Sequence, residues 1–513
     1  MPLTPMTPLL ALTAPATSFT PSTTAVGGNV YLTALVGLAP LVAFFVLMGV
    51  VKLKTHWCSL VSLGLAAVLA VALFRMPVGM TVMSGAQGAV MGLVPIVYII
   101  VAAVWLYNLT DVSGRSADLR AVFNVIGKGD VRAQALMVAF SFCGLLEGLA
   151  GFGAPVAIAA AMVAALGLPR IKSAVVVMVG NAINVGFGAM SIPVTTAARL
   201  GGAEPVTVAA TMGHLTWVFC AFIPLVLLFV LDGLRGVRQL WPLAVVSGLA
   251  TGAGHFVTPS VSYELTAVLA SLLGLAASYV FLLVWTPTTP REYRSQVDAA
   301  DVPTPERAVL ALLPYVLVVA MIAVTKLWKV GFDLSQVLSG TDVKIRWPGV
   351  YGDLLNAGGE PSASAVYTLQ ILSNPGTWIF ATGVVVTVVY AARSVPGRFE
   401  MSLGQGLRTL ASTCYNLRLA VLTIVSVMAL AYVMNFSGPT SAIGAALAAN
   451  TIGGGIGKIV SPQNLAIATT AVDAPGQDAE LLRRAAPYSL GLLLALCSLV
   501  LVASQGWLGN YLP

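Results

Sequence analysis

The segment LLEGLAGFGAP, residues 145–155, decides how this chain folds. It holds one acid, Glu147, and the residues on either side, 133–146 and 148–169, carry no charge. A charge at bilayer depth costs roughly 2.5–3.5 kcal/mol even on lenient insertion scales, so an isolated one usually has a function. The glycines and proline directly after Glu147 interrupt the helix. Backbone that leaves its helix at this depth must be buried in protein or line a wet cavity, so the segment predicts a binding site built on broken helices.

The composition outside this segment is that of a membrane protein. The chain is 58% hydrophobic and 9% charged, whereas a soluble domain carries about 25% charged residues. We predict an all-α polytopic membrane protein with roughly eleven to thirteen spanning or half-spanning helices, because about 20 apolar residues span a bilayer. The long charge-free runs are residues 30–51, 57–74, 76–110, 173–198, 265–290 and 419–457.

The basic residues lie in short loops between these runs, which argues against nucleic-acid binding despite the net charge of +7. The first 51 residues contain no Lys or Arg, so the positive-inside rule predicts an N-terminus outside. The orientation stays consistent only if residues 133–151 and 154–168 form a hairpin that enters and leaves on the same side. The loops then predicted inside contain Lys52 and Lys54, residues 115–132, Arg170 and Lys172, Arg235 and Arg238, and Arg291 and Arg294.

Composition also divides the chain. Residues 1–28, rich in Pro and Thr, predict a disordered tail, and residues 291–307 are polar enough to be a cytoplasmic linker. We expect Asp111, Arg115, Asp118 and Arg120 to form a solvated loop. The predicted units are the tail 1–28, an N-terminal membrane half 29–285, the linker 286–307 and a C-terminal membrane half 308–513, with an outside loop at 327–372.

Two distant segments run in register without a gap. Residues 181–193 and 450–462 share Asn, Ile, Gly, Gly and Pro at the same places. Transporters are commonly built from two inverted repeats whose interrupted helices meet at the middle of the membrane. The match therefore favours inverted repeats with re-entrant hairpins, with chance in a glycine-rich chain as the alternative.

The chemistry of these segments suits a small carboxylate. Half-helix N-termini offer free N–H groups, asparagine side chains donate and accept, and a buried ammonium needs an anion. Lys458 is the only base between residues 419 and 482, and it either contacts the ligand or extends to the interface from a helix end. Burial favours the neutral form of a carboxyl group, so Glu147 is a candidate proton carrier. Its alternative is a fixed salt bridge or a helix cap.

At these residues the chain resembles the L-lactate permease family. The motif consists of Leu146-Glu147-Gly148 followed by residues 151–158, GFGAPVAI. Further similar stretches are residues 187–193, Asp232-Gly233 with Trp241-Pro242, Gly453-Gly454, Gly457-Lys458 and Ser461-Pro462-Gln463. The resemblance extends from about residue 30 to the C-terminus.

The resemblance implies a secondary transporter, not an enzyme, that carries L-lactate or related short 2-hydroxy monocarboxylates (glycolate, D-lactate) with protons across the bacterial inner membrane. No cofactor is expected, and sodium coupling and a homo-oligomer are left open. Glu147 would couple the proton. The residues expected to bind substrate are Gly151, Gly153, Ala154, Asn181, Asn184, Ser191, His214, Asn450, Lys458, Ser461 and Gln463.

The chain departs from the family in two places. The first departure lies in the second half of the chain. No Ser/Asp/Asn-rich element stands between residues 438 and 450, and the apolar material between Arg398 and Arg483 does not divide into a number of membrane crossings that would place both arginines inside. A missing hairpin would explain both, and it raises an alternative function: a shortened, transport-impaired member acting as a carboxylate-binding sensor or partner. The second departure is His214, where the family often has Arg. It would make anion binding depend on pH, or it is a structural residue.

Overall fold

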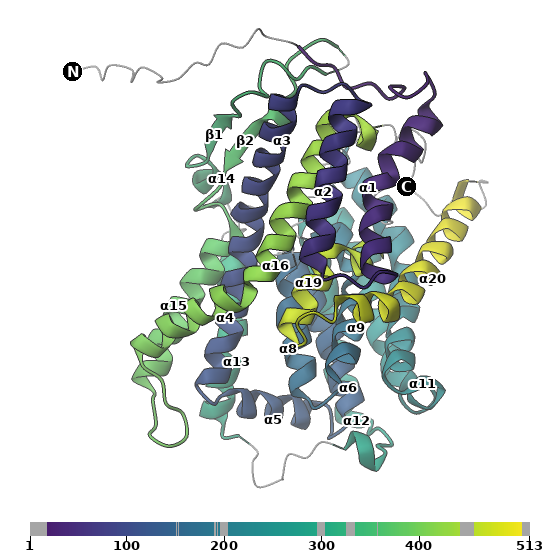
Figure 1. The fold of residues 1–513 in the computed structure, drawn as a ribbon. Helices are drawn as coiled ribbons and strands as arrows, with labels where there is room; N and C mark the ends of the chain where they lie inside the picture. The colour runs from purple at the N-terminus through teal and green to yellow at the C-terminus, as the bar shows by residue number, and fades with distance from the viewer. Residues whose placement is uncertain are drawn as a thin grey trace.

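The computed structural model describes residues 18–149, 151, 153–188, 191, 193–194, 198, 204–294, 303–324, 334–356, 358–441 and 456–504. Most of these residues are helical, and the two strands among them form one antiparallel hairpin, β1 (Val343–Arg346) with β2 (Val366–Leu369). Seven helical runs in this part of the chain are long and apolar enough to cross a membrane. The prediction of an all-α polytopic membrane protein is confirmed (Figure 1).

The N-terminal half contains a helix pair, a broken helix, a hairpin and a long folded run. The run α11 reverses at Asp232 and Gly233, where Gly233 has φ 60°, a conformation open to glycine. The elements are α1 (Val30–Gly49), α2 (Thr55–Ala72), α3 (Val78–Met91), η1 (Gly92–Val97), α4 (Tyr98–Val112), α5 (Ser116–Ile126), α6 (Val131–Leu136), η2 (Met137–Phe142), α7 (Cys143–Leu149), α8 (Ala154–Ala165), α9 (Arg170–Asn181), η3 (Asn184–Phe187), α11 (Pro205–Ser262), η4 (Tyr263–Leu265) and α12 (Thr266–Val284).

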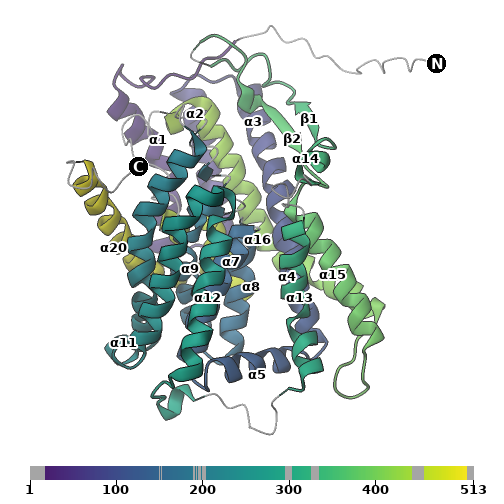
Figure 2. The ribbon, with the colours of Figure 1, turned by 180° about the vertical axis from the view of Figure 1, so that it is seen from behind.

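The C-terminal half has fewer long helices. Its described elements are η5 (Arg291–Tyr293), α13 (Pro305–Val324), α14 (Leu334–Ser339), β1, η8 (Ala363–Ala365), β2, α15 (Pro375–Ala392), α16 (Leu403–Ser437), η9 (Lys458–Val460), α19 (Pro462–Ala471) and α20 (Asp478–Ser504). The hairpin β1–β2 lies at one end of the molecule and α5 at the other, in both views (Figures 1 and 2). These ends are called the β-hairpin end and the α5 end below.

The predicted hairpin around Glu147 lies at the centre of the molecule. The run of α6, η2 and α7 forms its first arm and is 94% buried, whereas α1 is 28% buried. The second arm, α8, packs beside the first. Val138 of the first arm and Met162 of α8 line a small space together with Leu119 and Phe123 of α5. Both arms therefore end on the α5 side, as the orientation argument required.

Arg132 anchors the first arm at the α5 end. Its fully buried guanidinium lies 2.8 Å from the carboxylate of Asp130 and 2.6 Å from that of Asp232, and it donates to Gln239 Oε1 at 2.8 Å. Asp130 also caps α6 by accepting from the backbone N–H groups of Arg132 and Ala133. The start of the hairpin is thus bonded to the turn within α11.

We expect Arg132→Leu to destabilise the protein by about 3–5 kcal/mol, because it leaves the buried Asp130 without its charged partner and Asp232 with Arg235 alone. Thermal unfolding of the purified protein in detergent measures this. The matched control is Arg484→Gln, whose pair with Glu480 is 57% exposed on the arginine side and should contribute little. Equal losses of stability in the two variants would mean that burial does not set the strength of the Arg132 network.

The charged segment after α4 is not the solvated loop that we predicted. Arg115 and Asp118 are 2% and 1% exposed, and Asp118 pairs with Arg307 at the start of α13. The Arg115 guanidinium lies over the rings of Tyr390 and Phe399, 4.7 and 4.8 Å from their centroids. The prediction failed because these charges have partners more than a hundred residues away in sequence. Asp111 is exposed as expected, and the side chain of Arg120 is outside the described part.

At the β-hairpin end, the chain start is bonded to the segment around the hairpin. The N–H of Phe19 donates to Asp353 O at 2.7 Å, and Leu355 N donates to Phe19 O at 2.9 Å. Residues 18–28 therefore have defined contacts, although we expected a disordered tail over 1–28; residues 1–17 lie outside the described chain. The described residues of the predicted outside loop, 334–356 and 358–372, lie at this same end.

Three contacts place the ends of segments in the second half. The carbonyl of Arg393 accepts a hydrogen bond at 2.9 Å from the arginine that precedes α5, so Arg393 lies at the α5 end. A Cβ on Gly438, just after α16, would lie 3.0 Å from a backbone oxygen of residue 22, near the other end. Asp473 pairs at 2.9 Å with Arg170, where α9 begins. Residues 442–455 lie outside the described chain, so the missing hairpin stays a prediction.

Candidate functional site

Glu147 lies at the meeting point of three segments. Its side chain is 2% exposed, and its Oε1 lies 2.7 Å from Lys458 Nζ in η9. Its Oε2 accepts a hydrogen bond from Asn181 Nδ2 at 2.9 Å, at the end of α9. Asn181 and Lys458 come from the two segments that match in register, so those segments converge on one carboxylate.

The end of α9 is positioned by the hairpin itself. Cys143 lies one helical turn before Glu147, and therefore on the same face of α7. Its Sγ donates to Asn181 Oδ1 at 3.3 Å, which leaves the amide Nδ2 pointing at Glu147. The helix α9 ends at Asn181, and the short turn η3 follows two residues later. The asparagine thus sits where regular hydrogen bonding stops.

The starts of two half-helices lie close to the backbone that carries Lys458. Gly153 precedes α8 with φ 93°, and a Cβ there would lie 2.6 Å from Ile467 Cδ1 and 3.5 Å from Asn464 Oδ1 of α19. Ser461 caps α19 by accepting from Asn464 N at 3.3 Å, and Asn464 Nδ2 donates to Lys458 O at 3.0 Å. The starts of α8 and α19 are therefore adjacent. Helix N-termini carry partial positive charge, so this place favours an anion.

Gly188 leaves room for the Glu147 side chain. A Cβ at this position would lie 2.8 Å from Glu147 Oε1, closer than real Cβ contacts. Its counterpart in the register of the two segments is Gly457, next to Lys458, where a Cβ would meet no atom within 4 Å. A larger side chain would therefore clash with Glu147 at position 188, whereas there is space for one at position 457.

We expect Gly188→Ala to displace the Glu147 carboxylate from Lys458 and to impair function strongly, while Gly457→Ala is tolerated. Both variants add one methyl group at matched places, although the backbone is extended at Gly188 (φ −68°, ψ 158°) and helical at Gly457 (φ −61°, ψ −27°). Initial rates of substrate uptake into proteoliposomes, normalised to the amount of folded protein, compare them. Similar rates in the two variants would show that the fit of Gly188 against Glu147 is not required.

A second polar group extends from Asn184. Asn184 Oδ1 lies 3.1 Å from Nε2 of His255, which is fully buried in α11 beside the ring of Phe187. A Cβ on Gly144 would lie 2.5 Å from both Asn184 Nδ2 and Ser271 Oγ. The hairpin therefore approaches this polar group closely through a glycine, one turn from Glu147.

The structure brings together part of the predicted site. Glu147, Asn181 and Lys458 are in direct contact, and Ser461 supports Lys458 through Asn464. Gln463 Nε2 would lie 3.9 Å from a Cβ on Gly153. Gly151 (φ 60°), Gly153 and Ala154 form the described tip of the hairpin and the start of α8.

Other predicted residues lie elsewhere. Ser191 Oγ donates to Tyr263 O at 2.6 Å, and the ring of His214 stacks on Phe256 with centroids 4.1 Å apart. The side chain of Glu147 is instead bonded to Asn181 and Lys458. Asn450 lies outside the described chain.

The sequence analysis missed Cys143, His255 and Asn464. Asn464 follows the matched proline Pro462 by two residues, a signal that could have been used. His255 stands alone in an apolar helix, where a structural role is the usual interpretation. No local signal in the sequence indicates that His255 pairs with Asn184.

Comparison with known proteins agrees with the early resemblance. The family model for L-lactate permease matches residues 33–449 and 445–505. The L-lactate permease of Bacillus subtilis (strain 168) is 32% identical over 557 residues, which cover 93% of this chain and 97% of that protein. The glycolate permease GlcA and the L-lactate permease of Escherichia coli (strain K12) are each 28% identical, over 90% of this chain and 94% of each relative.

The family model matches in two pieces that overlap at residues 445–449. The alignment with the Bacillus subtilis relative is longer than the whole chain, so it contains gaps where that relative has additional residues. Nearly full coverage in both directions nevertheless shows a common architecture. The chain is a multi-pass membrane protein that belongs to the L-lactate permease family, a family of transporters.

Proposed function

We propose that the chain carries L-lactate, or a related short 2-hydroxy monocarboxylate such as glycolate or D-lactate, together with a proton. The substrate class follows the names of the relatives, an L-lactate permease and a glycolate permease. The observation that supports proton coupling is the pair of buried Glu147 and partly buried Lys458, whose charged atoms lie 2.7 Å apart.

The pair allows the Glu147 carboxylate and the substrate carboxylate to compete for Lys458. A buried ammonium needs a counter-charge, and ionised Glu147 supplies it while the site is empty. When Glu147 takes up a proton, it no longer balances Lys458. The substrate carboxylate then replaces it, and the N-termini of α8 and α19 stabilise the same negative charge. Protonation and substrate binding therefore promote each other.

This scheme keeps the site electrically neutral. The empty site holds one negative and one positive side chain, and the loaded site holds a neutral Glu147, a positive Lys458 and one carboxylate. Membrane voltage is worth about 2.3 kcal/mol per charge per 100 mV, and it would not drive a carrier that is neutral in both forms. The pH difference and the substrate gradient would drive it.

We place the protein in the bacterial inner membrane with its N-terminus outside. The α5 end carries Arg115, Arg132, Arg235, Arg307 and Arg393, and this excess of positive charge favours the cytoplasmic side. The polar segment 286–307 then links the two membrane halves in the cytoplasm, and the β-hairpin end faces outward.

The function is tested with purified protein in proteoliposomes. Labelled L-lactate should accumulate in the proteoliposomes against its gradient when the interior is alkaline. This accumulation should not change when a potassium-diffusion potential is imposed or when choline replaces sodium. Uptake that needs sodium, or that follows voltage without a pH gradient, would contradict proton symport.

A second candidate function is a transport-impaired family member that binds a carboxylate as a sensor or partner. The interruption of the family match at residues 445–449 favours it, because these residues lie between α16 and Lys458. Its signature is thermal stabilisation by L-lactate with no flux into proteoliposomes. Accumulation under a pH gradient excludes it.

A further inference from the structure

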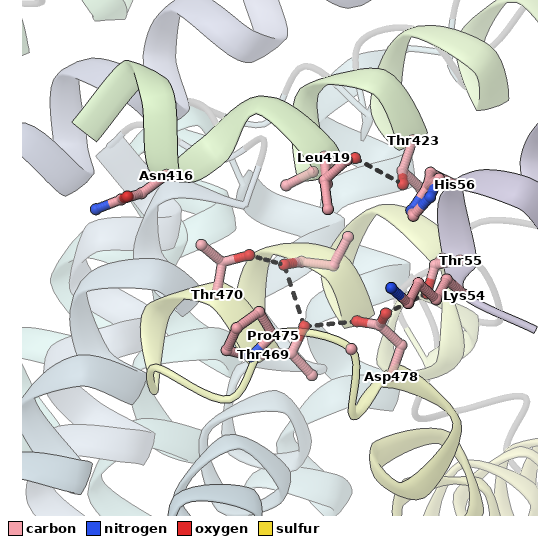
Figure 3. Close-up of a pocket in the computed structure, with 13 residues that line it drawn as sticks. Lys54, Thr55, His56, Asn416, Leu419, Thr423, Thr469, Thr470, Pro475 and Asp478 are labelled. Carbon is pink, nitrogen blue, oxygen red and sulfur yellow. Dashed lines mark hydrogen bonds between the residues drawn. The ribbon is translucent and has the colours of Figure 1, made fainter. Parts of the chain in front are cut away.

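A separate cavity of about 290 Å³ lies between the start of α2, the middle of α16, the C-terminal part of α19 and the start of α20 (Figure 3). The helix α19 connects it to the Glu147 site without making them one. Asn464, near the start of α19, is bonded to Lys458, whereas Thr469 and Thr470, near its end, line the cavity. The cavity opens beside the exposed residues Asn416 and Gly476, so a solute can reach it without passing Glu147.

Two donors lie at one end of the cavity. Lys54 and His56, on either side of the first residue of α2, line this end, whereas Asn416 of α16 lies at the opposite end (Figure 3). The start of α2 has no side-chain cap, so the positive end of its dipole adds to the field of Lys54. An ammonium and a helix N-terminus together favour a carboxylate.

The hydroxyl groups of the cavity have already used their hydrogens. Thr55 and Thr469 donate to the two oxygens of Asp478, the latter at 2.5 Å, and Asp478 is 8% exposed. Thr423 donates to Leu419 O at 3.0 Å, and Thr470 donates to Ala466 O at 2.7 Å. A hydroxyl has one hydrogen and two lone pairs, so these oxygens can offer the cavity only lone pairs.

We propose that this cavity is a second binding site, for a short 2-hydroxy acid. Lys54 and the N-terminus of α2 hold the carboxylate of the ligand, and its 2-hydroxyl group donates to the threonine oxygens. An acid without that hydroxyl leaves the threonine lone pairs without a hydrogen, so it binds more weakly. The volume is close to the lower limit of about 300 Å³ for small-molecule pockets, which fits a ligand of this size. The choice of L-lactate as the probe rests on the proposed function.

Equilibrium dialysis of labelled L-lactate against the full chain in nanodiscs tests the proposal. The variant Lys458→Met weakens the central site strongly, so that one remaining site is expected per chain. In this background, Lys54→Gln should weaken L-lactate about tenfold or more, because it removes a charge-assisted bond. Thr423→Val keeps the shape and removes an acceptor oxygen; it should weaken L-lactate several-fold and leave propionate unchanged.

The outcomes separate this site from the central one. No L-lactate binding in Lys458→Met, or binding that neither Lys54→Gln nor Thr423→Val weakens, overturns the proposal even if the parent chain transports lactate. Propionate binding as tightly as L-lactate overturns the role of the hydroxyl. If L-lactate binds in nanodiscs of phosphatidylcholine but is displaced when the nanodisc lipid is phosphatidylglycerol, the cavity would instead be assigned to lipid phosphate. If the parent chain shows no pH-driven uptake of L-lactate but L-lactate still binds to the second cavity, the proposed function is rejected and the second binding site is not.

Discussion

Replacing Glu147 by glutamine is expected to abolish the accumulation of L-lactate driven by a pH gradient. In the parent chain, one proton per lactate supports up to about tenfold accumulation per pH unit, because one pH unit is worth about 1.36 kcal/mol. Glutamine cannot carry the proton and leaves Lys458 permanently without its carboxylate. Substrate can therefore still bind, and exchange of internal for external lactate should persist while net uptake slows.

The same variant should acquire sensitivity to voltage. Its loaded site is neutral, but its empty site carries the unbalanced charge of Lys458 and must return across the membrane field. Uptake by Glu147→Gln should therefore respond to a diffusion potential to which the parent chain is indifferent. Glu306→Gln is the control, since Glu306 is 66% exposed in its pair with Arg393. If Glu147→Gln still accumulates lactate under a pH gradient, Glu147 is a fixed structural ion and the coupling scheme is wrong.

Replacing Lys458 by methionine is expected to weaken substrate binding at the central site strongly. The ammonium is the positive side chain in contact with Glu147, and a hydrogen bond to a charged group contributes about 1.5–3 kcal/mol. Affinity should therefore fall by roughly ten- to a hundredfold, and uptake with it. Initial uptake rates over a range of lactate concentrations measure the loss, because it should appear as a higher KM.

The controls distinguish binding from folding. Lys344→Met removes an ammonium from the exposed strand β1 and should leave uptake unchanged. Lys458→Met alone leaves Glu147 without its charged partner, which is destabilising unless the carboxyl group takes up a proton. The double variant Glu147→Gln with Lys458→Met should regain stability but not binding. A double variant that binds lactate as the parent does would show that the pair has only a structural role.

The central hairpin was predictable because its signals are local. An isolated Glu147 in an apolar stretch, followed at once by helix-breaking residues, predicts a re-entrant turn without reference to any other segment. The register between residues 181–193 and 450–462 then predicted which distant segments meet it. Asn181 and Lys458 contact Glu147 as that match requires. The alternative for Lys458 was extension to the membrane interface, but its ammonium contacts Glu147 instead. The alternative for Glu147 included a salt bridge, and this salt bridge is observed.

The features that were missed depend on long-range packing. Arg115 and Asp118 have the composition of a solvated loop, and their burial is caused by Tyr390, Phe399 and Arg307, which no local pattern indicates. The contact between His255 and Asn184 likewise requires the position of α11 relative to η3. The cavity at Asp478 combines residues from four helices, so it is visible only once the helices are placed.

The most direct test of the coupling scheme is the proton uptake that accompanies lactate binding to the purified protein in weakly buffered solution. Proton uptake by the Lys458→Met variant gives the contribution of the second cavity. This contribution is subtracted from the proton uptake of the parent chain, measured at a pH where Glu147 is ionised. The scheme predicts that about one proton is taken up for each lactate bound at the central site, and none in Glu147→Gln. Lactate binding to the parent chain without proton uptake, or equal proton uptake in Glu147→Gln, would contradict it.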